Sequence, residues 1–347
     1  MTTVSDATGM DGGMRRAPAP SDHFDGKRFF NPGVDTDKRL ADFVRWRRTG
    51  KRHAWPDRVE NRHYPSFGAV GDATVTYIGQ ATLLLRAAGL NILTDPVFAE
   101  RIGPFPHIGG PRRVRAPGLP IAALPPIHAV LLSHNHYDHM DLPSLHRLRD
   151  RDDPPILTGL GNGAYLRRQG FARCVELDWW DAAPLPAGGA AAGAAAAAVA
   201  TFVPAQHWSG RWVIDRRRTL WGGFVVAMPD GRRVYFAGDT GYAPAHFAAI
   251  RERLGPPGLA LLPIGAYEPR WFMKAQHMNP DDAARAHLDL AARVSVGIHF
   301  GTFQLTDEAI DAPAADLRTV LARHGIPERS FIVPGFGETL PIPARGA

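Results

Sequence analysis

This chain of 347 residues contains a single cysteine, Cys174, and lacks any long apolar run. One cysteine excludes an intrachain disulfide and a metal cluster held by several thiolates, and it is compatible with a reducing compartment. No window reaches the roughly 18 apolar residues of a membrane-spanning helix. The first 25 residues also lack the apolar core of about 7–15 residues that a signal peptide needs. We therefore expect a cytoplasmic protein, with membrane contact that is at most peripheral.

The excess of positive over negative charge lies almost entirely in one stretch of the chain. The formal net charge is +6, and residues 38–62 alone contain nine Lys and Arg against three Asp and Glu, an excess equal to that of the whole chain. Together with Trp46 and Trp55, this stretch predicts peripheral contact with an anionic membrane or a phosphate-bearing partner. A solvated linker and helix face is the plainer interpretation. Because the excess is confined to one stretch, we expect no nucleic-acid partner.

The length of the chain allows one large α/β domain or two smaller ones. We expect a single compact domain over residues 67–345 with an N-terminal extension. Residues 1–25 mix Gly, Pro, Asp, Ser and Thr without periodicity, which is typical of a disordered arm. Residues 26–66 predict a basic strap that contains a short helix and lies across the main domain. The Ala/Gly-rich stretch 187–200 is interpreted as a surface insertion or a marginal helix, without a chemical role.

The densest chemistry lies at residues 133–141, Ser-His-Asn-His-Tyr-Asp-His-Met-Asp, directly after the apolar run 129–132. Three histidines and an aspartate within six positions cannot all share one face of a strand or a helix, because side chains repeat there every two or about 3.6 residues. The segment must therefore be a tight loop whose side chains converge. Imidazole and carboxylate in such a loop suit zinc or a similar divalent ion. Asp141 and Pro143 indicate that a helix begins immediately afterwards.

Several other β-rich runs also end at a residue that is able to bind metal. A single histidine or aspartate after a strand is usually structural, but repeated strand ends of this kind, with the dense loop among them, argue against coincidence. The run 91–94 ends at Asp95, which is either a turn former or a partner that holds a ligand histidine. The other donors are His207 after the run 201–204, Asp239 after 234–237 and His299 after 294–298.

These donors are sufficient for two metal ions with three or four protein ligands each, which leaves an open position for water, as in a catalytic site. Two ions about 3.5–4 Å apart form a hydrolytic centre, in which a hydroxide held by the ions attacks the substrate near neutral pH. No serine or cysteine nucleophile is needed. The ligand sets are His134, His136 and His207 for one ion and Asp138, His139 and His299 for the other, with Asp239 able to bridge.

This order of motifs resembles the metallo-β-lactamase superfamily of hydrolases, whose signature is the His-x-His-x-Asp-His loop. Longer matches over roughly residues 27–305 narrow the resemblance to the N-acyl-phosphatidylethanolamine-hydrolysing phospholipase D family. Besides the dense loop, the matching segments are Asn31-Pro32, Thr94-Asp95-Pro96, 176–180, Gln206-His207-Trp208, 236–242, 264–274, Gln276-His277 and Ile298-His299.

The resemblance implies an α/β (α+β) fold, namely the metallo-β-lactamase αββα four-layer sandwich. It also implies two Zn²⁺ ions per chain, although iron or manganese is an open alternative. The implied reaction cleaves the phosphodiester of N-acyl-phosphatidylethanolamine and releases N-acylethanolamine and phosphatidate. By analogy the seven donors carry over position by position, and His277 matches a further histidine that acts in the family's active site.

The sequence around His277 supports a role in the site. Asn279 is a suitable N-cap, Pro280 suits the first helical position, and two aspartates follow in the first turn. His277 therefore precedes a helix N-terminus, where phosphate is readily bound. We expect it to be catalytic together with Asp138 and Asp239, and either to orient the phosphoryl group or to protonate the leaving oxygen. A surface histidine in a loop is the plainer interpretation.

The segment 267–273 interleaves aromatic and charged side chains, as a lipid site with an apolar wall and a cationic spot would. Core packing is the alternative for its aromatic residues. One departure concerns Gly79-Gln80-Ala81-Thr82, where the family commonly has Gly-His-Ala-Thr, so that any supporting role of that histidine falls to an amide or is absent. The candidate substrate-binding residues are Tyr137, Tyr267, Arg270, Trp271 and His277.

The predicted function is a zinc-dependent phosphodiesterase that acts on a phospholipid or another phosphodiester. The nearest alternative applies the same site to another ester, such as a lactone, because fold does not fix substrate. A non-enzymatic alternative is a membrane-surface binding protein with a vestigial site. The complete ligand set argues against it, because burying seven polar ligands without an ion is costly. The sequence does not indicate the oligomeric state.

Overall fold

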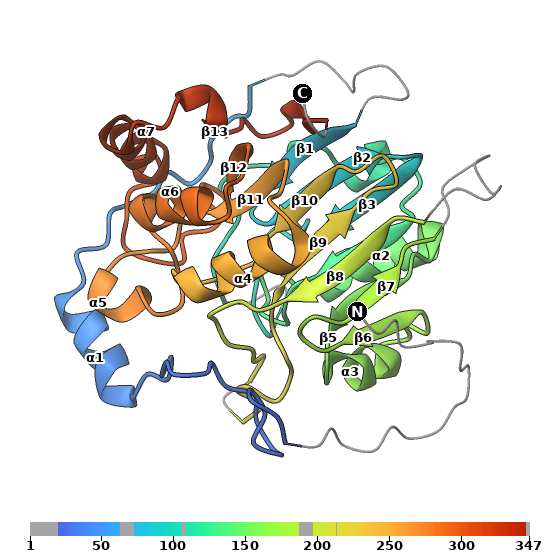
Figure 1. The fold of residues 1–347 in the computed structure, drawn as a ribbon. Coiled ribbons are helices and arrows are strands. Elements are labelled where there is room, and N and C mark those ends of the chain that lie inside the picture. The colour runs from blue at the N-terminus through green and yellow to red at the C-terminus, as the bar shows by residue number, and fades with distance from the viewer. Residues whose placement is uncertain (1–19, 63–72, 106–108, 187–196, 213, 345–347) are drawn as a thin grey trace.

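The computed structural model describes residues 20–62, 73–105, 109–186, 197–212 and 214–344. Two seven-stranded sheets lie face to face, and helices cover the outer surface of each sheet (Figure 1). The predicted αββα four-layer sandwich is therefore confirmed. Within the described part of the chain, no helix has the length and apolar character needed to cross a membrane.

The first sheet has antiparallel strands at one edge and parallel strands at the other. In spatial order its strands are β14 (Thr339–Pro341), β1 (Thr74–Gly79), β2 (Thr82–Ala87), β3 (Leu90–Thr94), β4 (Ala129–Leu132), β5 (Ile156–Gly159) and β6 (Cys174–Leu177). The antiparallel part runs from β14 to β3, and the parallel part runs from β3 to β6. All four residues of β4 are buried, as expected for an apolar run in a parallel sheet covered on both faces.

The second sheet repeats this arrangement. In spatial order its strands are β13 (Phe331–Ile332), β12 (Val294–Ile298), β11 (Leu259–Pro263), β10 (Arg233–Phe236), β9 (Gly223–Ala227), β8 (Val199–Val203) and β7 (Ala182–Pro184). Strands β10 to β13 are parallel, and β7 to β10 are antiparallel. Because β8 and β10 both run antiparallel to β9, their carboxyl ends meet those of β11 and β12 at one edge.

The helices of the described residues are α1 (Leu40–Thr49), α2 (Leu142–Asp152), α3 (Asn162–Arg168), α4 (Pro244–Leu254), α5 (Arg270–Met273), α6 (Pro280–Asp289) and α7 (Ala312–His324), with 3₁₀ turns at Ile121–Ala123 and Glu328–Ser330. Helices α2 and α3 pack on the first sheet, and α4, α6 and α7 pack on the second. Helix α2 begins directly after Asp141, as predicted. Helix α6 begins as predicted too, since Asn279 Oδ1 accepts the Asp282 N–H at 2.9 Å.

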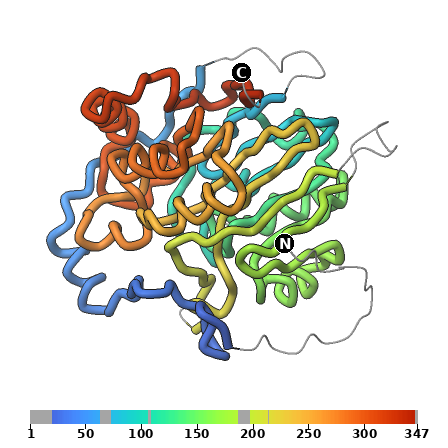
Figure 2. Tube along the Cα trace, in the orientation of Figure 1, coloured from blue at the N-terminus to red at the C-terminus, as the bar shows by residue number. Residues whose placement is uncertain are grey.

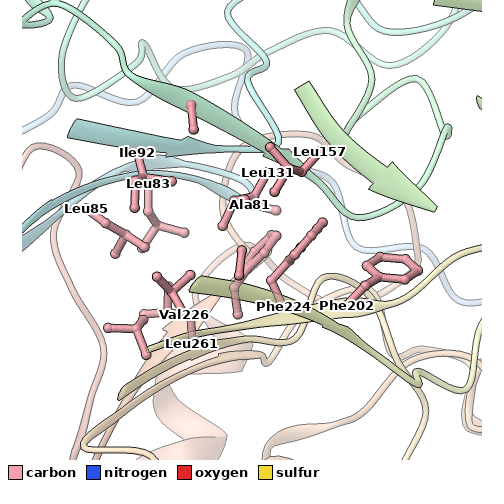
Figure 3. Close-up of a cluster of buried hydrophobic side chains, with 14 of the residues drawn as sticks. Ala81, Leu83, Leu85, Ile92, Leu131, Leu157, Phe202, Phe224, Val226 and Leu261 are labelled. Atoms are coloured by element: carbon pink, nitrogen blue, oxygen red, sulfur yellow. The ribbon is translucent and has the colours of Figure 1, made fainter. Parts of the chain in front are cut away.

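The main core lies between the two sheets (Figure 3). Leu83 and Leu131 from the first sheet face Phe202 and Phe224 from the second, and all four are fully buried. Leu84, the neighbour of Leu83, instead belongs to the cluster under α2 and α3, because side chains alternate along a strand. Each such side chain contributes roughly 1.5–3 kcal/mol through burial. The sandwich therefore forms a firm frame for the edge where the strand ends meet.

The N-terminal segment runs along the outside of this frame (Figures 1 and 2). The helix predicted within the strap is α1, which packs on α5. The Phe272 ring centroid lies 5.0 Å from that of Phe43 and 4.9 Å from that of Trp46. Trp46 Nε1 also donates to Asp307 Oδ2 at 2.8 Å. The strap is thus attached by aromatic packing and by a partly buried hydrogen bond.

Three predicted boundaries fall partly outside the described residues. Residues 1–19 of the predicted disordered arm are not among them, but His23 and Phe24 are buried, so the arm does not extend to residue 25. The predicted boundary between residues 66 and 67 also lies outside them. Of the predicted insertion, the structure describes only the last four residues, and Val199 already belongs to β8.

Candidate metal centre

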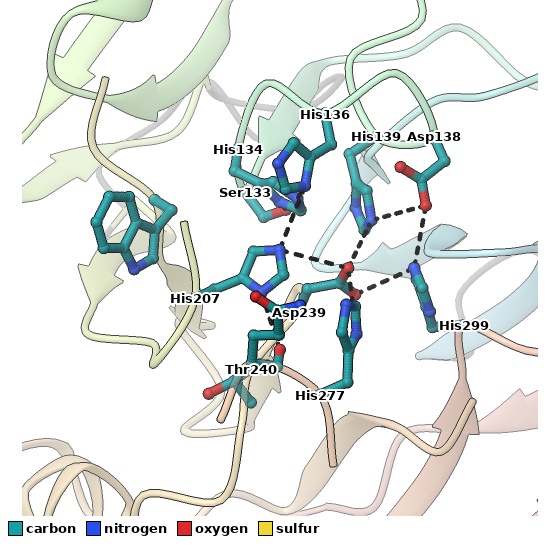
Figure 4. A network of polar contacts seen from close by, with 12 residues as sticks. Ser133, His134, His136, Asp138, His139, His207, Asp239, Thr240, His277 and His299 are labelled. Carbon is teal, nitrogen blue, oxygen red and sulfur yellow. Dashed lines mark hydrogen bonds and ion pairs between the residues drawn. The ribbon is translucent and has the colours of Figure 1, made fainter. Parts of the chain in front are cut away.

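Seven side chains predicted as metal donors converge at the edge where the carboxyl ends of strands from both sheets meet (Figure 4). Strand β4 leads into the loop that contains four of them, and β8, β10 and β12 each precede one more. Six of the seven are buried. Their donor atoms fall into a first donor group, His134, His136 and His207, and a second donor group, Asp138, His139, Asp239 and His299.

In the first donor group the ring nitrogens face one another. His136 Nδ1 lies 2.8 Å from His134 Nε2 and 3.3 Å from His207 Nε2. The opposite nitrogens are engaged elsewhere, since His134 Nδ1 lies 2.9 Å from Ser133 Oγ and His207 Nδ1 donates to the Gln276 carbonyl at 2.9 Å. These contacts orient the rings of His134 and His207 and leave their inward nitrogens able to bind an ion.

The second donor group contains both carboxylates. His139 Nε2 lies 3.2 Å from Asp239 Oδ2 and 3.5 Å from Asp138 Oδ2. His299 Nε2 lies 3.2 Å from Asp138 Oδ2 and 3.2 Å from Asp239 Oδ1. Behind the group, His139 Nδ1 donates to Asp95 Oδ2 at 2.6 Å. Of the two interpretations of Asp95, the structure therefore favours the partner that holds a predicted ligand.

Both groups fit divalent ions. Zinc lies about 2.0–2.2 Å from nitrogen and oxygen ligands, which places two ligands of one ion roughly 3–3.5 Å apart. Asp239 Oδ2 also lies 3.8 Å from His207 Nε2, so its carboxylate is near both groups. Among the described residues, the buried atoms His139 Nε2 and Asp239 Oδ1 have no hydrogen-bond partner. A bound cation would remove the cost of that burial.

Burial and neighbouring charge set the protonation of the donors. Burial lowers the pKa of His134 and His207 well below the usual range and that of His136 to about 3, so these rings are neutral at pH 7. Burial alone would also lower the pKa of His139, but the carboxylates of Asp239, Asp138 and Asp95 outweigh it and raise this pKa well above the usual range. The two carboxylates of the second donor group in turn have strongly lowered pKa values, although burial opposes this, and are ionised.

His277 lies beside the seven donors, close to both groups (Figure 4). Its Nδ1 is 3.8 Å from Asp239 Oδ2, and its ring centroid is 5.1 Å from that of His207. This nitrogen is buried and has no hydrogen-bond partner among the described residues. Burial lowers the pKa of His277 to about 4. The ring is therefore neutral at pH 7 and offers a hydrogen bond, but it carries no extra proton.

Two of the predicted substrate contacts are engaged by neighbouring protein groups. Tyr137 donates to the Arg211 carbonyl at 2.8 Å, and the Arg211 guanidinium lies 4.1 Å from its ring centroid, beside a pocket of about 280 Å³. Arg270 binds Asp282 Oδ2 at 2.6 Å and the His277 carbonyl at 2.9 Å. The Arg270 guanidinium therefore ties α5 to the start of α6, and it does not stand free before the donors.

The other two predicted contacts, Tyr267 and Trp271, line a separate pocket of about 570 Å³ between α1, α5 and α7. Tyr267 donates its hydroxyl to Asp316 at 2.5 Å, and Trp271 is 38% exposed under the Arg45 guanidinium. None of the seven donors is among the described residues that line this pocket. The structure thus brings His277 to the donors but not these two side chains.

Sequence reasoning missed several residues that support the donors, among them Asn31 and Arg211. Asn31 pairs with both backbone groups of His207, since its Nδ2 donates to the carbonyl at 2.8 Å and its Oδ1 accepts the N–H at 3.2 Å. Arg211 braces the dense loop through its Nη1, which donates to the carbonyls of Asn135 and Met140 at 3.0 and 2.8 Å. The Asn31-Pro32 match was the only sign of the first role, and nothing in the sequence indicated the second.

Comparison with known proteins agrees with this geometry. Residues 90–300 match the family described as "Beta-lactamase superfamily domain". The chain is 36% identical over 289 residues to N-acyl-phosphatidylethanolamine-hydrolyzing phospholipase D 1 of Caenorhabditis elegans, which covers 81% of this chain and 79% of the worm protein. It is 34% identical to the mitochondrial N-acyl-phosphatidylethanolamine-hydrolyzing phospholipase D of Saccharomyces cerevisiae, over 76% of this chain but only 55% of the yeast protein.

Among solved structures, a possible metal-dependent hydrolase of Veillonella parvula matches with a TM-score of 0.61 at 20% identity, over 78% of this chain and 100% of that one. This likeness shows the fold. The family match spans more than half of the chain, and the donors of the site are those of a metal-dependent hydrolase. The chain therefore belongs to the metallo-β-lactamase superfamily of hydrolases, within which it resembles the N-acyl-phosphatidylethanolamine-hydrolysing phospholipases D.

Proposed function

We propose that this protein is a phosphodiesterase that uses two zinc ions to hydrolyse N-acyl-phosphatidylethanolamine or a related phospholipid. The products would be N-acylethanolamine and phosphatidate. The observation that carries the proposal is the pair of donor groups with Asp239 near both. The names of the worm and yeast relatives support this lipid class as the substrate. Iron or manganese at the same donors is the alternative that metal analysis separates from zinc.

Ions held by the two donor groups would supply a nucleophile from water near neutral pH and would offset the charge of a phosphodiester. The residues of the chain do the remaining work. Asp138 and Asp239 are ionised and balance the positive charge within the site. His277 is neutral, so we assign it a hydrogen bond that orients a phosphoryl oxygen, in preference to proton donation to the leaving oxygen.

We also propose that residues 38–62 make peripheral contact with an anionic membrane, as a cytoplasmic protein would at an inner surface. Helix α1 exposes Leu40 at 79% and Val44 at 43%, one helical turn apart and within the basic stretch. The helix packs on Phe272 of α5, and the chain after α5 leads to His277. Contact at α1 would therefore hold the lipid near the donors.

Metal analysis and a hydrolysis panel test the enzyme. We expect about two equivalents of zinc per chain, with turnover of N-acyl-phosphatidylethanolamine above that of simple phosphodiesters and lactones. A folded protein that binds no divalent ion would overturn the proposal. Two bound ions with turnover of lactones and none of phosphodiesters would assign the site to another ester. Full turnover by His277→Ala with unchanged metal content would exclude the role given to that residue.

Vesicle sedimentation tests the membrane contact. We expect binding to vesicles that contain phosphatidylglycerol, weaker binding to neutral vesicles, and loss of binding when Leu40→Glu and Val44→Glu are combined. The two substitutions are on an exposed helix face and should not disturb folding. Equal binding of the double variant would place the contact elsewhere.

A further inference from the structure

Gln80 contacts the second donor group differently from the supporting residues described above. Ser133 and Asp95 each contact a ring nitrogen that points away from the centre. Gln80 Nε2 instead lies 2.9 Å from Asp138 Oδ2 and 2.8 Å from His299 Nε2, the atoms that face the ion position. The side chain is only 1% exposed. Its amide thus stands where a further ligand would stand.

The backbone between β1 and β2 aims this side chain inward. Gln80 has a φ of +56°, a left-handed conformation that is strained for a residue with a Cβ. Its N–H donates to Thr302 Oγ1 at 2.9 Å, and its carbonyl accepts the His299 N–H at 2.8 Å. The preceding Gly79 has no room for a side chain, since a Cβ there would lie 2.9 Å from the Phe336 ring. Strain held in this way is typical of functional sites.

The two separations are those expected between ligands of one ion. For bonds of about 2.1 Å, ligands at right angles lie about 3 Å apart. A half-turn of the amide exchanges its nitrogen and oxygen, which are similar in size, and brings Oε1 to the same place. We propose that Gln80 makes this turn when the second ion binds and supplies Oε1 as a fifth protein ligand beside Asp138, His139, Asp239 and His299.

The turn follows from the charges in the group. Without an ion, Asp138 Oδ2 accepts a hydrogen bond from Gln80 Nε2 at 2.9 Å, and His299 Nε2 lies 2.8 Å from the same nitrogen, so the amide N–H faces the carboxylate. Asp138 Oδ2 and His299 Nε2 would both hold an ion in the second donor group, and the amide N–H of Gln80 would then face a cation. The turn gives up the hydrogen bond to Asp138 Oδ2, and a bond between Oε1 and the ion would replace it. A neutral amide oxygen is an acceptable ligand for divalent cations and adds no charge to a group that already contains two carboxylates.

This inference rests on the proposed two-ion site, and Co²⁺ titration of ion-free protein tests it. The variants are Gln80→Leu, Gln80→Glu and the control Gln206→Leu, which removes another buried amide beside a predicted ligand, where Nε2 donates to the Ala275 carbonyl. We expect Gln80→Leu to weaken the second Co²⁺ about tenfold and to leave the first unchanged. Gln80→Glu should bind the second Co²⁺ at least as tightly as the natural protein, and Gln206→Leu should bind both normally.

Visible absorption provides a second readout, because four-coordinate Co²⁺ absorbs more strongly than five- or six-coordinate Co²⁺. We expect a stronger band from the second equivalent in Gln80→Leu than in the natural protein. Two ions bound by Gln80→Leu with unchanged or higher affinity and an unchanged spectrum would overturn the inference and leave the proposed function standing. No ion bound by the natural protein would overturn both. If Gln80→Leu does not fold, weaker binding of the second ion by Gln80→Glu would overturn the inference.

Discussion

The two donor groups lie side by side but are built from different parts. The first consists of three histidines, and two of them are held from behind by a hydroxyl and a main-chain carbonyl. The second contains two carboxylates, and a third carboxylate, that of Asp95, stands behind His139. One half of the centre is therefore assembled by neutral hydrogen bonds and the other half by charge.

This difference determines how the charge of each group is balanced before an ion binds. Burial keeps the first donor group neutral, so no charge there lacks a partner. In the second donor group the carboxylates raise the pKa of His139 well above its usual range, and the protonated ring supplies part of the missing positive charge. Substitutions that remove charge should therefore affect the second group most, and those that remove neutral hydrogen bonds should affect the first.

The largest effect is expected from Asp239→Asn, which removes the charge near both groups. We expect kcat/KM for phosphodiesters to fall at least about a hundredfold, because a ligand should matter more than the partners that only orient ligands. Elemental analysis should show loss of the second ion before the first. Asn has nearly the shape of Asp, so the thermal unfolding temperature of the variant provides the folding control. Full activity of the variant with two bound ions would show that the Asp239 carboxylate is not shared between the two ions.

A smaller effect, about 10- to 100-fold in the affinity of the second ion, is expected from Asp95→Asn. The substitution keeps the shape but removes the charge that holds His139 Nδ1 at 2.6 Å. Ser133→Ala is the matched variant for the first group, because Ser133 Oγ lies 2.9 Å from His134 Nδ1, although the same hydroxyl also donates to Asp95 Oδ2 at 2.5 Å. In stepwise zinc titration, Asp95→Asn should lose more affinity for the second ion, and Ser133→Ala should lose more affinity for the first. The same loss at the same position in both would contradict the division of the centre into two halves.

Asn31→Ala should weaken the first ion about tenfold. It leaves the buried N–H of His207 without its partner and the His207 carbonyl with only the Thr36 hydroxyl at 3.5 Å, at a cost of roughly 1–3 kcal/mol. Zinc titration measures the change, and the second ion should bind as before. Asn91→Ala serves as the control, because its Nδ2 donates to the Pro126 carbonyl at the exposed start of β3. Equal losses in the two asparagine variants would mean that the strap plays no part in the site.

The seven donors were predictable because each lies in a short stretch with a local signal. An apolar run sets a strand, and the residue after it reaches the edge where neighbouring strands end. The beginnings of α2 and α6 were predictable for a similar reason, since Asp141 and Asn279 are helix-capping residues next to proline. Such signals depend only on neighbouring residues.

The surroundings of the donors were not predictable, because they depend on contacts between distant segments. Asn31 lies 176 residues from His207, and no pattern in the sequence joins them. Arg270 reads as a phosphate-binding cation, yet Asp282 neutralises it after the chain folds back. Gln80 was visible only as a departure from the family's histidine. Its contacts depend on how the turn after β1 meets the turn after β12.

The smallest effect is expected just before the strap, where His23 lies between two carboxylates. His23 Nδ1 is 2.6 Å from Asp22 Oδ1, its Nε2 is 2.7 Å from Asp178 Oδ1, and its ring stacks on Trp179. Burial alone would lower the pKa of His23, but the carboxylates raise it above 6.5. The stabilisation is therefore complete below about pH 6.5 and is lost as the pH rises through the pKa of the folded state.

Hydrogen exchange of the Phe29 amide, which donates to the Arg217 carbonyl at 2.8 Å, measures this loss. Between pH 6 and pH 9 its protection factor should fall up to about fivefold, since an ion pair with an exposed partner contributes about 1 kcal/mol at most. In His23→Phe, which keeps the ring against Trp179, protection should not change with pH, and the sheet amide of Val130 should stay protected throughout. Protection of Phe29 that rises with pH would mean that charge does not hold the strap. Because the strap reaches the donors through Asn31 and His207, any effect on ion binding should appear in the first donor group alone and remain below that of Asn31→Ala.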